Sequence, residues 1–345
     1  MNTPRTRRRT AAWARLSDEQ LLKLRFCDLG LTVRGSNIEG AMRRLYEELG
    51  SRGIRFRPHI WLSEEWFSPD GVPGIAVPFY LAHPRLARLE RSLMGQVEGG
   101  NSRWLMRILR HEAGHAIDNA YRLRRRKRWR EAFGPASLRY PDRYKARPGS
   151  RRYVHHLGDW YAQAHPTEDF AETFAVWLTP RSGWRKRYAD WPAVRKLHTV
   201  DELMAEVRER PAPVRTRARI EPIDANTRTL AEHYRRKAAR YRQYRRGMVD
   251  AMLQWVFSED RPRRGAVRAS TLLRAHQRAL SDAVSRELGL PRYSVREIMR
   301  AMIDRSEALQ LYVRGDRRDA VQVSRWLLER LASLYSQGET PHIPL

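Results

Sequence analysis

The chain has 345 residues, 41% of them hydrophobic, so it is long enough to bury a sizeable core. Its 67 basic and 39 acidic residues give a formal charge of +28 at pH 7, which favours nucleic acid, anionic membrane surfaces or acidic substrates as partners, although the strong preference for arginine can also reflect codon usage. A single cysteine, Cys27, excludes an intrachain disulfide and a cysteine zinc cluster, and no apolar stretch approaches the ~20 residues of a membrane span, so we expect a cytoplasmic location.

The N-terminal part predicts a tail followed by two helices. Residues 1–16 are basic and lack the apolar core of a secretory signal, so we expect a disordered, solvated tail. Ser17 and Gln20 form a capping box, which predicts a short helix through Leu24. A second helix is expected over residues 37–50.

Residues 54–89 have the chemistry of strands and turns and predict a small sheet beside the active site. After the break at residues 99–101, Ser102 can cap a long helix. The inward face of this helix is expected to include Trp104, Ile108, His111, His115 and Asn119.

Within this helix, residues 111–115 read HEAGH, an HExxH pattern. His111 and His115 are four residues apart, so both imidazoles project from one face and can take two corners of a tetrahedral zinc site. Glu112 lies beside them and can act as the general base for attack of water on a carbonyl. Such a short pattern also occurs by chance, but Gly114 permits close helix packing beneath a metal.

A catalytic zinc needs a third protein ligand. Asp118 and Tyr121 stand where a metzincin would continue with Gly and His, so that class is excluded. A second amphipathic helix, expected from about Thr167 to Leu178, offers Glu168 as ligand and Glu172 as acceptor for a ligand imidazole. Acidic residues are also favourable in the first turn of any helix. The rival ligands are His155, His156 and His165.

The stretch HEAGHAID from His111 to Asp118, Tyr161 seven residues before Glu168, and the run EDFAETF together resemble the catalytic domain of anthrax lethal factor. The chain resembles more closely a family of bacterial chains described as "putative zinc-binding metallopeptidase". The resemblance covers residues 100–180 in its motifs.

The resemblance implies a gluzincin site with one Zn²⁺ per chain, held by His111, His115 and Glu168. It further implies Glu112 as general base and Tyr161 as hydrogen-bond donor to the oxyanion, a role for which Tyr153 is an alternative. Asp118 could orient a ligand histidine, or it could be a solvated aspartate.

The remaining sequence is expected to be loop and helix. Seven of the nine residues from Arg122 to Arg130 are basic, and Trp129 among them could stack on a base, although a solvated continuation of the preceding helix is the alternative. Residues 135–158 suggest a surface loop, and residues 206–226 a proline-containing linker. Helices are expected near 228–257, 270–287, 294–313 and 319–336, the third of them with a capping box of Ser294 and Glu297.

These patterns predict an α+β, zincin-like metallopeptidase domain over residues 17–205 and an α-helical region over residues 227–345. The expected reaction is hydrolysis of peptide bonds by zinc-activated water with Glu112 as base. One alternative is a basic nucleic-acid-binding or regulatory protein with a structural or vestigial zinc site, and another is hydrolysis of a non-peptide amide. Oligomeric state cannot be predicted.

Overall fold

The computed structural model describes residues 11–94, 97–141, 144, 147, 150–158, 160–260 and 266–336, and leaves out the side chains of 241–248 and 335–336. Most of the predicted basic tail therefore lies outside the described residues. The described chain is mostly helical with one small sheet, consistent with an α+β class. None of its helices is long and apolar enough to cross a membrane.

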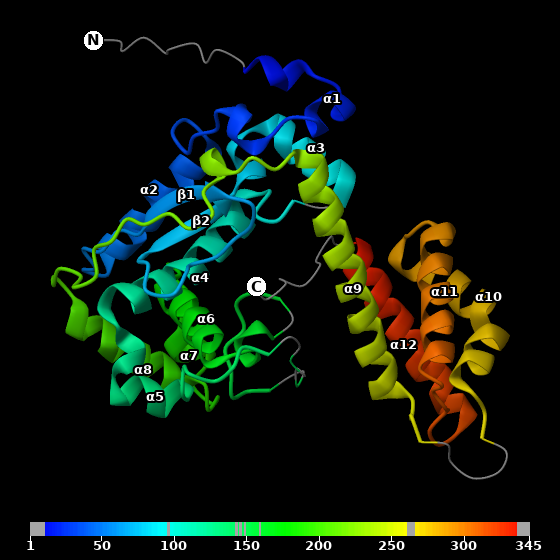
Figure 1. Ribbon diagram of the computed structural model, residues 1–345. Helices are drawn as coiled ribbons and strands as arrows, with labels where there is room; N and C mark the ends of the chain where they lie inside the picture. The colour runs from blue at the N-terminus through cyan, green and yellow to red at the C-terminus, as the bar shows by residue number, and fades with distance from the viewer. Residues whose placement is uncertain are drawn as a thin grey trace. The chain divides into compact units, whose positions relative to one another are not determined.

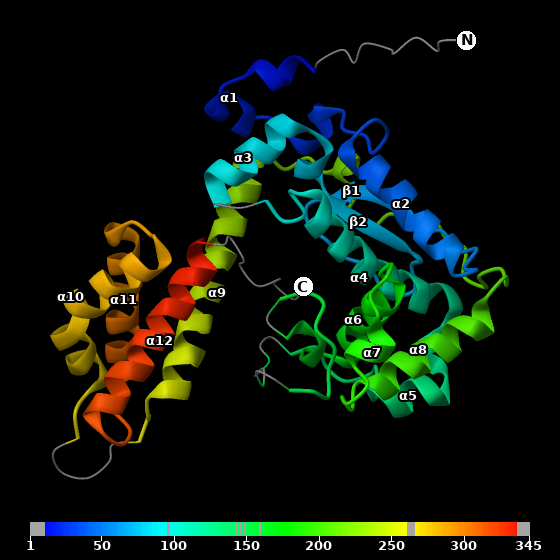
Figure 2. The same ribbon diagram turned by 180° about the vertical axis from the view of Figure 1, so that it is seen from behind.

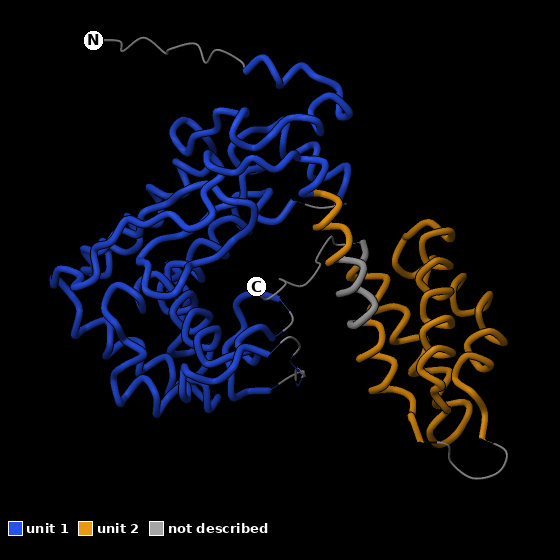
Figure 3. The backbone as a smooth tube through the Cα atoms, in the orientation of Figure 1, with its two compact units in different colours: residues 1–233, 344–345 blue, residues 234–343 orange. Residues whose placement is uncertain are grey.

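The chain forms two compact units, residues 1–233 with 344–345 and residues 234–343 (Figure 3). Unit 1 holds a two-stranded sheet and the helices that precede α9 (Figure 1). Its main elements are α1 (Asp18–Leu22), α2 (Asn37–Ser51), β1 (His59–Ser63), β2 (Gly74–Pro78), α3 (Pro84–Met94), α4 (Ser102–Tyr121), α5 (Lys127–Phe133), α6 (Pro166–Leu178), α7 (Trp184–Arg187) and α8 (Val194–Val207).

The first described residues differ from the prediction of disorder. Residues 12–15 form a 3₁₀ helix, and Trp13 in it is buried. The Trp13 indole donates a 2.9 Å hydrogen bond to the Leu29 carbonyl, which anchors this segment to the unit. The capping box of Ser17 and Gln20 is present and starts α1 as predicted.

The sheet was predicted, but its topology was not. β1 and β2 pair in parallel, with Ile60 opposite Ile75. A parallel pair needs a crossover, and here residues 64–73 supply it in place of a helix. Asn119 of α4 fixes this connection: its side-chain amide donates to the carbonyls of Pro69 and Val72 at 2.9 and 3.1 Å, and its carbonyl accepts from the Gly71 N–H at 3.1 Å.

The segment expected to be a linker, residues 206–226, belongs to unit 1 instead. Side chains of β1 hold its backbone: Trp61 donates to the Ile220 carbonyl and Ser63 to the Glu221 carbonyl, at 2.9 and 2.7 Å. These bonds satisfy carbonyls that an exposed linker would leave to water.

Two helices of unit 1, α4 and α6, pack against each other and lie side by side in both views (Figures 1 and 2). Their direction is antiparallel, because His115 contacts Glu168 while the earlier His111 contacts the later Glu172. A Cβ atom added to Gly114 would lie 2.8 Å from the Ala171 Cα, so glycine is what permits this close approach. Buried Arg110 also forms a bidentate ion pair with Glu48 of α2, and both N–O distances are 2.7 Å.

Unit 2 consists of helices packed around one apolar core. Its helices are α9 (Leu230–Val256, which begins in unit 1), α10 (Ala269–Leu288), α11 (Arg292–Ala308) and α12 (Arg317–Ser336). The predicted capping box of Ser294 and Glu297 is wrong, because α11 begins one turn earlier, after Pro291. Trp255 and Trp326 are 60% and 47% exposed and lie with their rings 5.6 Å apart.

Candidate metal centre

The helix that carries the HExxH pattern has defined ends. Asn101, rather than the predicted Ser102, is its N-cap, since the Asn101 side chain accepts a 2.9 Å hydrogen bond from the Trp104 N–H. It ends at Tyr121, where Arg122 adopts a left-handed conformation. The basic run is therefore not a continuation of the helix. Trp129 is buried against Phe133 and Phe170, so the predicted stacking of Trp129 on a base is wrong.

Three side chains from α4 and α6 meet at one point. His111 Nε2 lies 3.0 Å from Glu168 Oε2, His115 Nε2 lies 3.3 Å from the same oxygen, and the two Nε2 atoms are 3.2 Å apart. Tetrahedral zinc with bonds of about 2.0–2.1 Å places neighbouring ligand atoms about 3.3 Å apart. These three residues therefore form a His-His-Glu cluster able to hold one metal ion.

Glu172 supports this cluster from the next turn of α6. Its Oε1 atom lies 2.9 Å from His111 Nδ1, and its Oε2 atom accepts a 2.8 Å hydrogen bond from the Leu157 N–H. A hydrogen bond at Nδ1 fixes the orientation of the ring and directs Nε2 toward a metal. Glu172 thus contacts the His111 nitrogen that faces away from Glu168.

The charges of the buried cluster favour a cation. Glu112, Glu168 and Glu172 are all buried beside His111 and the less buried His115. Burial disfavours the charged forms, but hydrogen bonds from both histidines and their charge hold the pKa of Glu168 well below its usual range. Burial likewise opposes charge on His111, yet its bonds to Glu168 and Glu172 raise its pKa well above 6.5. A metal ion would replace the imidazole proton, because a ligand histidine is neutral.

The carboxylate of Glu112 is a second feature that is consistent with a bound ligand beside the cluster. Its Oε2 atom is fully buried and has no hydrogen-bond partner in the part of the chain that the structure describes. An unpaired buried carboxylate oxygen is costly, so its retention indicates a partner of another kind, such as water, substrate or metal. The Glu112 carboxylate also lies close enough to Tyr161 to raise the pKa of that phenol, after the larger effects of burial, Glu168 and Tyr140.

Two tyrosines face the cluster. The buried ring of Tyr161 lies 5.5 Å from the His111 ring, between centroids. The Tyr161 hydroxyl is 3.3 Å from that of Tyr140, whose pKa burial and the neighbouring Glu168 raise far above 10. Sequence reasoning missed Tyr140, because it lies in an irregular segment where no periodicity assigns it to a face.

The three rival ligands make contacts outside the cluster. His165 caps α6: its Nδ1 accepts from the Thr167 N–H, and its Nε2 donates to the Leu138 carbonyl at 3.0 Å. His156 Nε2 donates to the Arg107 carbonyl at 2.9 Å. His155 packs edge-on against Trp191. None of them joins the metal cluster found among the described residues.

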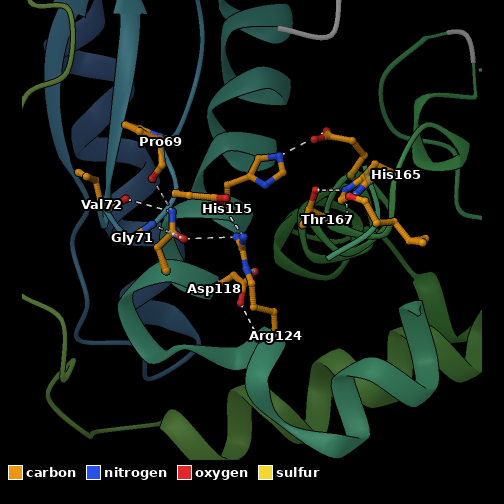
Figure 4. A network of polar contacts seen from close by, with 12 residues as sticks. Pro69, Gly71, Val72, His115, Asp118, Arg124, His165 and Thr167 are labelled. Atoms are coloured by element: carbon orange, nitrogen blue, oxygen red, sulfur yellow. Dashed lines mark hydrogen bonds and ion pairs between the residues drawn. The ribbon is translucent and has the colours of Figure 1, made fainter. Parts of the chain in front are cut away.

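Two further expectations need correction. Asp118 is buried, and its oxygens bind the backbone N–H and the Nε of Arg124 at 2.8 and 2.6 Å, so it supports the chain after α4 rather than a ligand histidine (Figure 4). Tyr153, the alternative oxyanion donor, instead lies beneath the Lys196 ammonium, 4.1 Å from its ring centroid.

Comparison with known families bears on the same segment. A family model described as "Putative zinc-binding metallo-peptidase" matches residues 89–183. The matched segment extends from α3 to just beyond α6, so it contains all three residues of the cluster as well as Glu112, Tyr161 and Glu172. Searches of curated proteins and of solved structures found no match.

Proposed function

We propose that unit 1 is the zincin-like catalytic domain of a gluzincin-type peptidase, with one Zn²⁺ held by His111, His115 and Glu168. The observation that carries the proposal is the triangle of ligand atoms, 3.0 to 3.3 Å on each side. It lies in a segment that matches a zinc-binding metallopeptidase family. The substrate class is peptide or protein, and a cytoplasmic location remains part of the proposal.

The chain's own residues have distinct roles in this reaction. Zinc, when bound, polarises a carbonyl and makes water acidic enough to attack near neutral pH. Glu112 accepts the proton of the attacking water on its unpaired carboxylate oxygen and passes it to the leaving amine. Tyr161 donates a hydrogen bond to the carbonyl oxygen as negative charge develops there. Because its pKa is raised, the Tyr161 phenol keeps its proton throughout the neutral range.

The first test is the zinc content of the purified protein by elemental analysis. We expect about one zinc per chain in the wild type and in His198→Ala, an exposed histidine outside the cluster. His115→Ala and Glu168→Ala should lose it, and Glu172→Gln should bind zinc 10- to 100-fold more weakly. A wild type without zinc even after reconstitution would overturn the proposal.

The second test separates metal binding from catalysis. Glu112→Gln should retain zinc and lower kcat on a fluorogenic peptide pool by about 10²- to 10⁴-fold. Tyr161→Phe should retain zinc and lower kcat by about 10²- to 10³-fold, whereas Tyr140→Phe should have a smaller effect. Cleavage that is unchanged in Glu112→Gln would rule out the proposed base.

A further inference from the structure

A cavity of about 520 Å³ lies in unit 1 outside the metal cluster. It is bounded by α2, the N-terminal half of α4, the segment of His155 and His156, the end of α6, and α7. The groups proposed to bind zinc or act on substrate are not among its lining residues. Its volume falls within the range of small-molecule sites, roughly 300–1,000 Å³.

The lining of this cavity is strongly cationic. Among its described lining residues there is no carboxylate, and there are five arginines: Arg44, Arg103, Arg107, Arg110 and Arg187. Glu48 neutralises part of this charge through ion pairs with Arg44 and Arg110. The side chains of Arg103, Arg107 and Arg187 have no ion-pair partner among the residues that the structure describes. Three guanidinium groups around one cavity therefore have no carboxylate partner in the described chain, and one of them, that of Arg187, lies over the Tyr188 ring.

Uncharged donors complete the lining. Ser102 and Arg103 form the first turn of α4, where backbone N–H groups lack helical partners and the helix dipole is positive. His155 also lines the cavity, but its Nε2 atom is buried away from it and does not serve as a donor there. The Ser182 hydroxyl, after α6, is a further lining group. These uncharged donors thus come from the start of α4 and from the segment after α6.

The cavity and the metal cluster both lie along the packed helices α4 and α6. Arg107 precedes His111 by four residues, about 6 Å along the axis of α4, and Val176 of the lining follows Glu172 by four residues on α6. Because the helices are antiparallel, the cavity occupies the next part of the same α4–α6 interface. The two sites share a scaffold and no residue.

We infer that this cavity binds a small ligand that carries two phosphate groups. Guanidinium groups bind phosphate oxygens through paired, charge-assisted hydrogen bonds. Two phosphate groups carry roughly three negative charges near pH 7, which matches the three arginines that have no carboxylate partner in the described chain. The helix N-terminus and the Ser182 hydroxyl supply donors for the remaining oxygens.

Isothermal titration calorimetry of the full chain with pyrophosphate, in a phosphate-free chloride buffer, tests the inference. We expect one pyrophosphate per chain and an affinity that falls as salt rises. Arg103→Gln and Arg187→Gln should each weaken binding about tenfold, and the double variant about a hundredfold. Both side chains are exposed, so their loss leaves the core intact. Arg130→Gln on α5, an exposed arginine outside the cavity, is the matched control and should bind as the wild type.

Because pyrophosphate also chelates zinc, the titration is repeated with His115→Ala. Unchanged binding there would place the ligand away from the metal cluster, so the result does not depend on the proposed peptidase function. No binding by the wild type, equal weakening in Arg130→Gln, or loss of binding in His115→Ala would each overturn the inference. Tight binding of a single-stranded oligonucleotide without binding of pyrophosphate would also overturn it, in favour of a nucleic-acid surface.

Discussion

Gly114 controls how closely the two ligand-bearing helices approach. A Cβ there would lie 2.8 Å from the backbone Cα of Ala171, which cannot move aside as a flexible side chain could. We expect Gly114→Ala to separate the helices, destabilise unit 1 by about 1–3 kcal/mol and weaken zinc binding. Chemical denaturation and zinc titration would measure both effects.

Gly40 provides the matched control for this substitution. It also lies inside a helix, α2, but a Cβ added there meets no atom within 4 Å. Gly40→Ala should therefore stabilise the protein by about 0.5–1 kcal/mol through helix propensity alone. Gain of stability in both variants would contradict the role assigned to Gly114.

His156 makes stability depend on pH. Burial lowers the pKa of His156 to about 4, despite the opposing effects of Glu172 and the Arg107 carbonyl. Between pH 6.5 and 4, His156 binds a proton in the unfolded chain but not in the folded chain, so the free energy of unfolding decreases as the pH falls. The loss amounts to about 2 kcal/mol at pH 5.

His156→Gln, which retains a hydrogen-bond donor, should reduce the difference in unfolding free energy between pH 7 and pH 5 by about 2 kcal/mol. Urea denaturation at both pH values would show this. The exposed His198→Gln variant should keep the wild-type pH dependence, and an equal change in both variants would disprove the assignment.

At the residue scale, the spacing of His111 and His115 is enough to predict that they meet, because four residues is one helical turn. The sequence favoured Glu168 as the third ligand, but only the tertiary structure shows that Glu168, and not His155, His156 or His165, lies beside these two histidines. Each of the other three histidines contacts a carbonyl or an aromatic ring outside the cluster. These partners are distant in the sequence, so the residues next to each histidine do not reveal them. Asp118 was misjudged for the same reason, since Arg124 binds it through the turn after α4.

At the scale of the elements, Asn119 attaches α4 to the segment that connects β1 and β2. Its amide satisfies two carbonyls and one N–H of residues 69–72. We expect Asn119→Ala to destabilise unit 1 by about 2–3 kcal/mol, because these backbone groups lose their partner. Urea unfolding would measure the loss. Asn37→Ala, at an exposed helix start, should change stability by less than about 0.5 kcal/mol, and equal effects would refute the assignment.

The predicted helices were recognisable because their apolar residues recur with helical period, and most of their observed boundaries lie within a few residues of the expected ones. The helices α3, α5, α7 and α8 were not predicted, and α3 begins inside the segment 54–89 that was expected to form strands and turns. The parallel pairing of β1 and β2 could not be predicted, because the residue types of a strand do not specify which strand it pairs with or in which direction. The segment at residues 206–226 was likewise taken for a linker from its prolines. Its attachment to β1 depends on Trp61 and Ser63, which lie far away in the sequence.

At the scale of the whole molecule, zinc should stabilise only one of the two units. All three proposed ligands lie in unit 1, and unit 2 has a separate apolar core. Zinc at 100 times its dissociation constant would add about 2.7 kcal/mol to the unfolding free energy of unit 1. Calorimetry with and without a chelator should show one transition that shifts and one that does not. In His115→Ala neither should shift, and a zinc-dependent shift of both in the wild type would contradict this division.

The distribution of tryptophan gives the two units different optical properties. Nine of the 11 tryptophans lie in unit 1, and those of its core, such as Trp66 and Trp177, are almost fully buried. Unit 2 contains only Trp255 and Trp326, both substantially exposed. Acrylamide should therefore quench the fluorescence of unit 2 first and leave mainly the blue-shifted emission of unit 1. Tryptophan fluorescence can therefore follow the unfolding of each unit separately, without an added label.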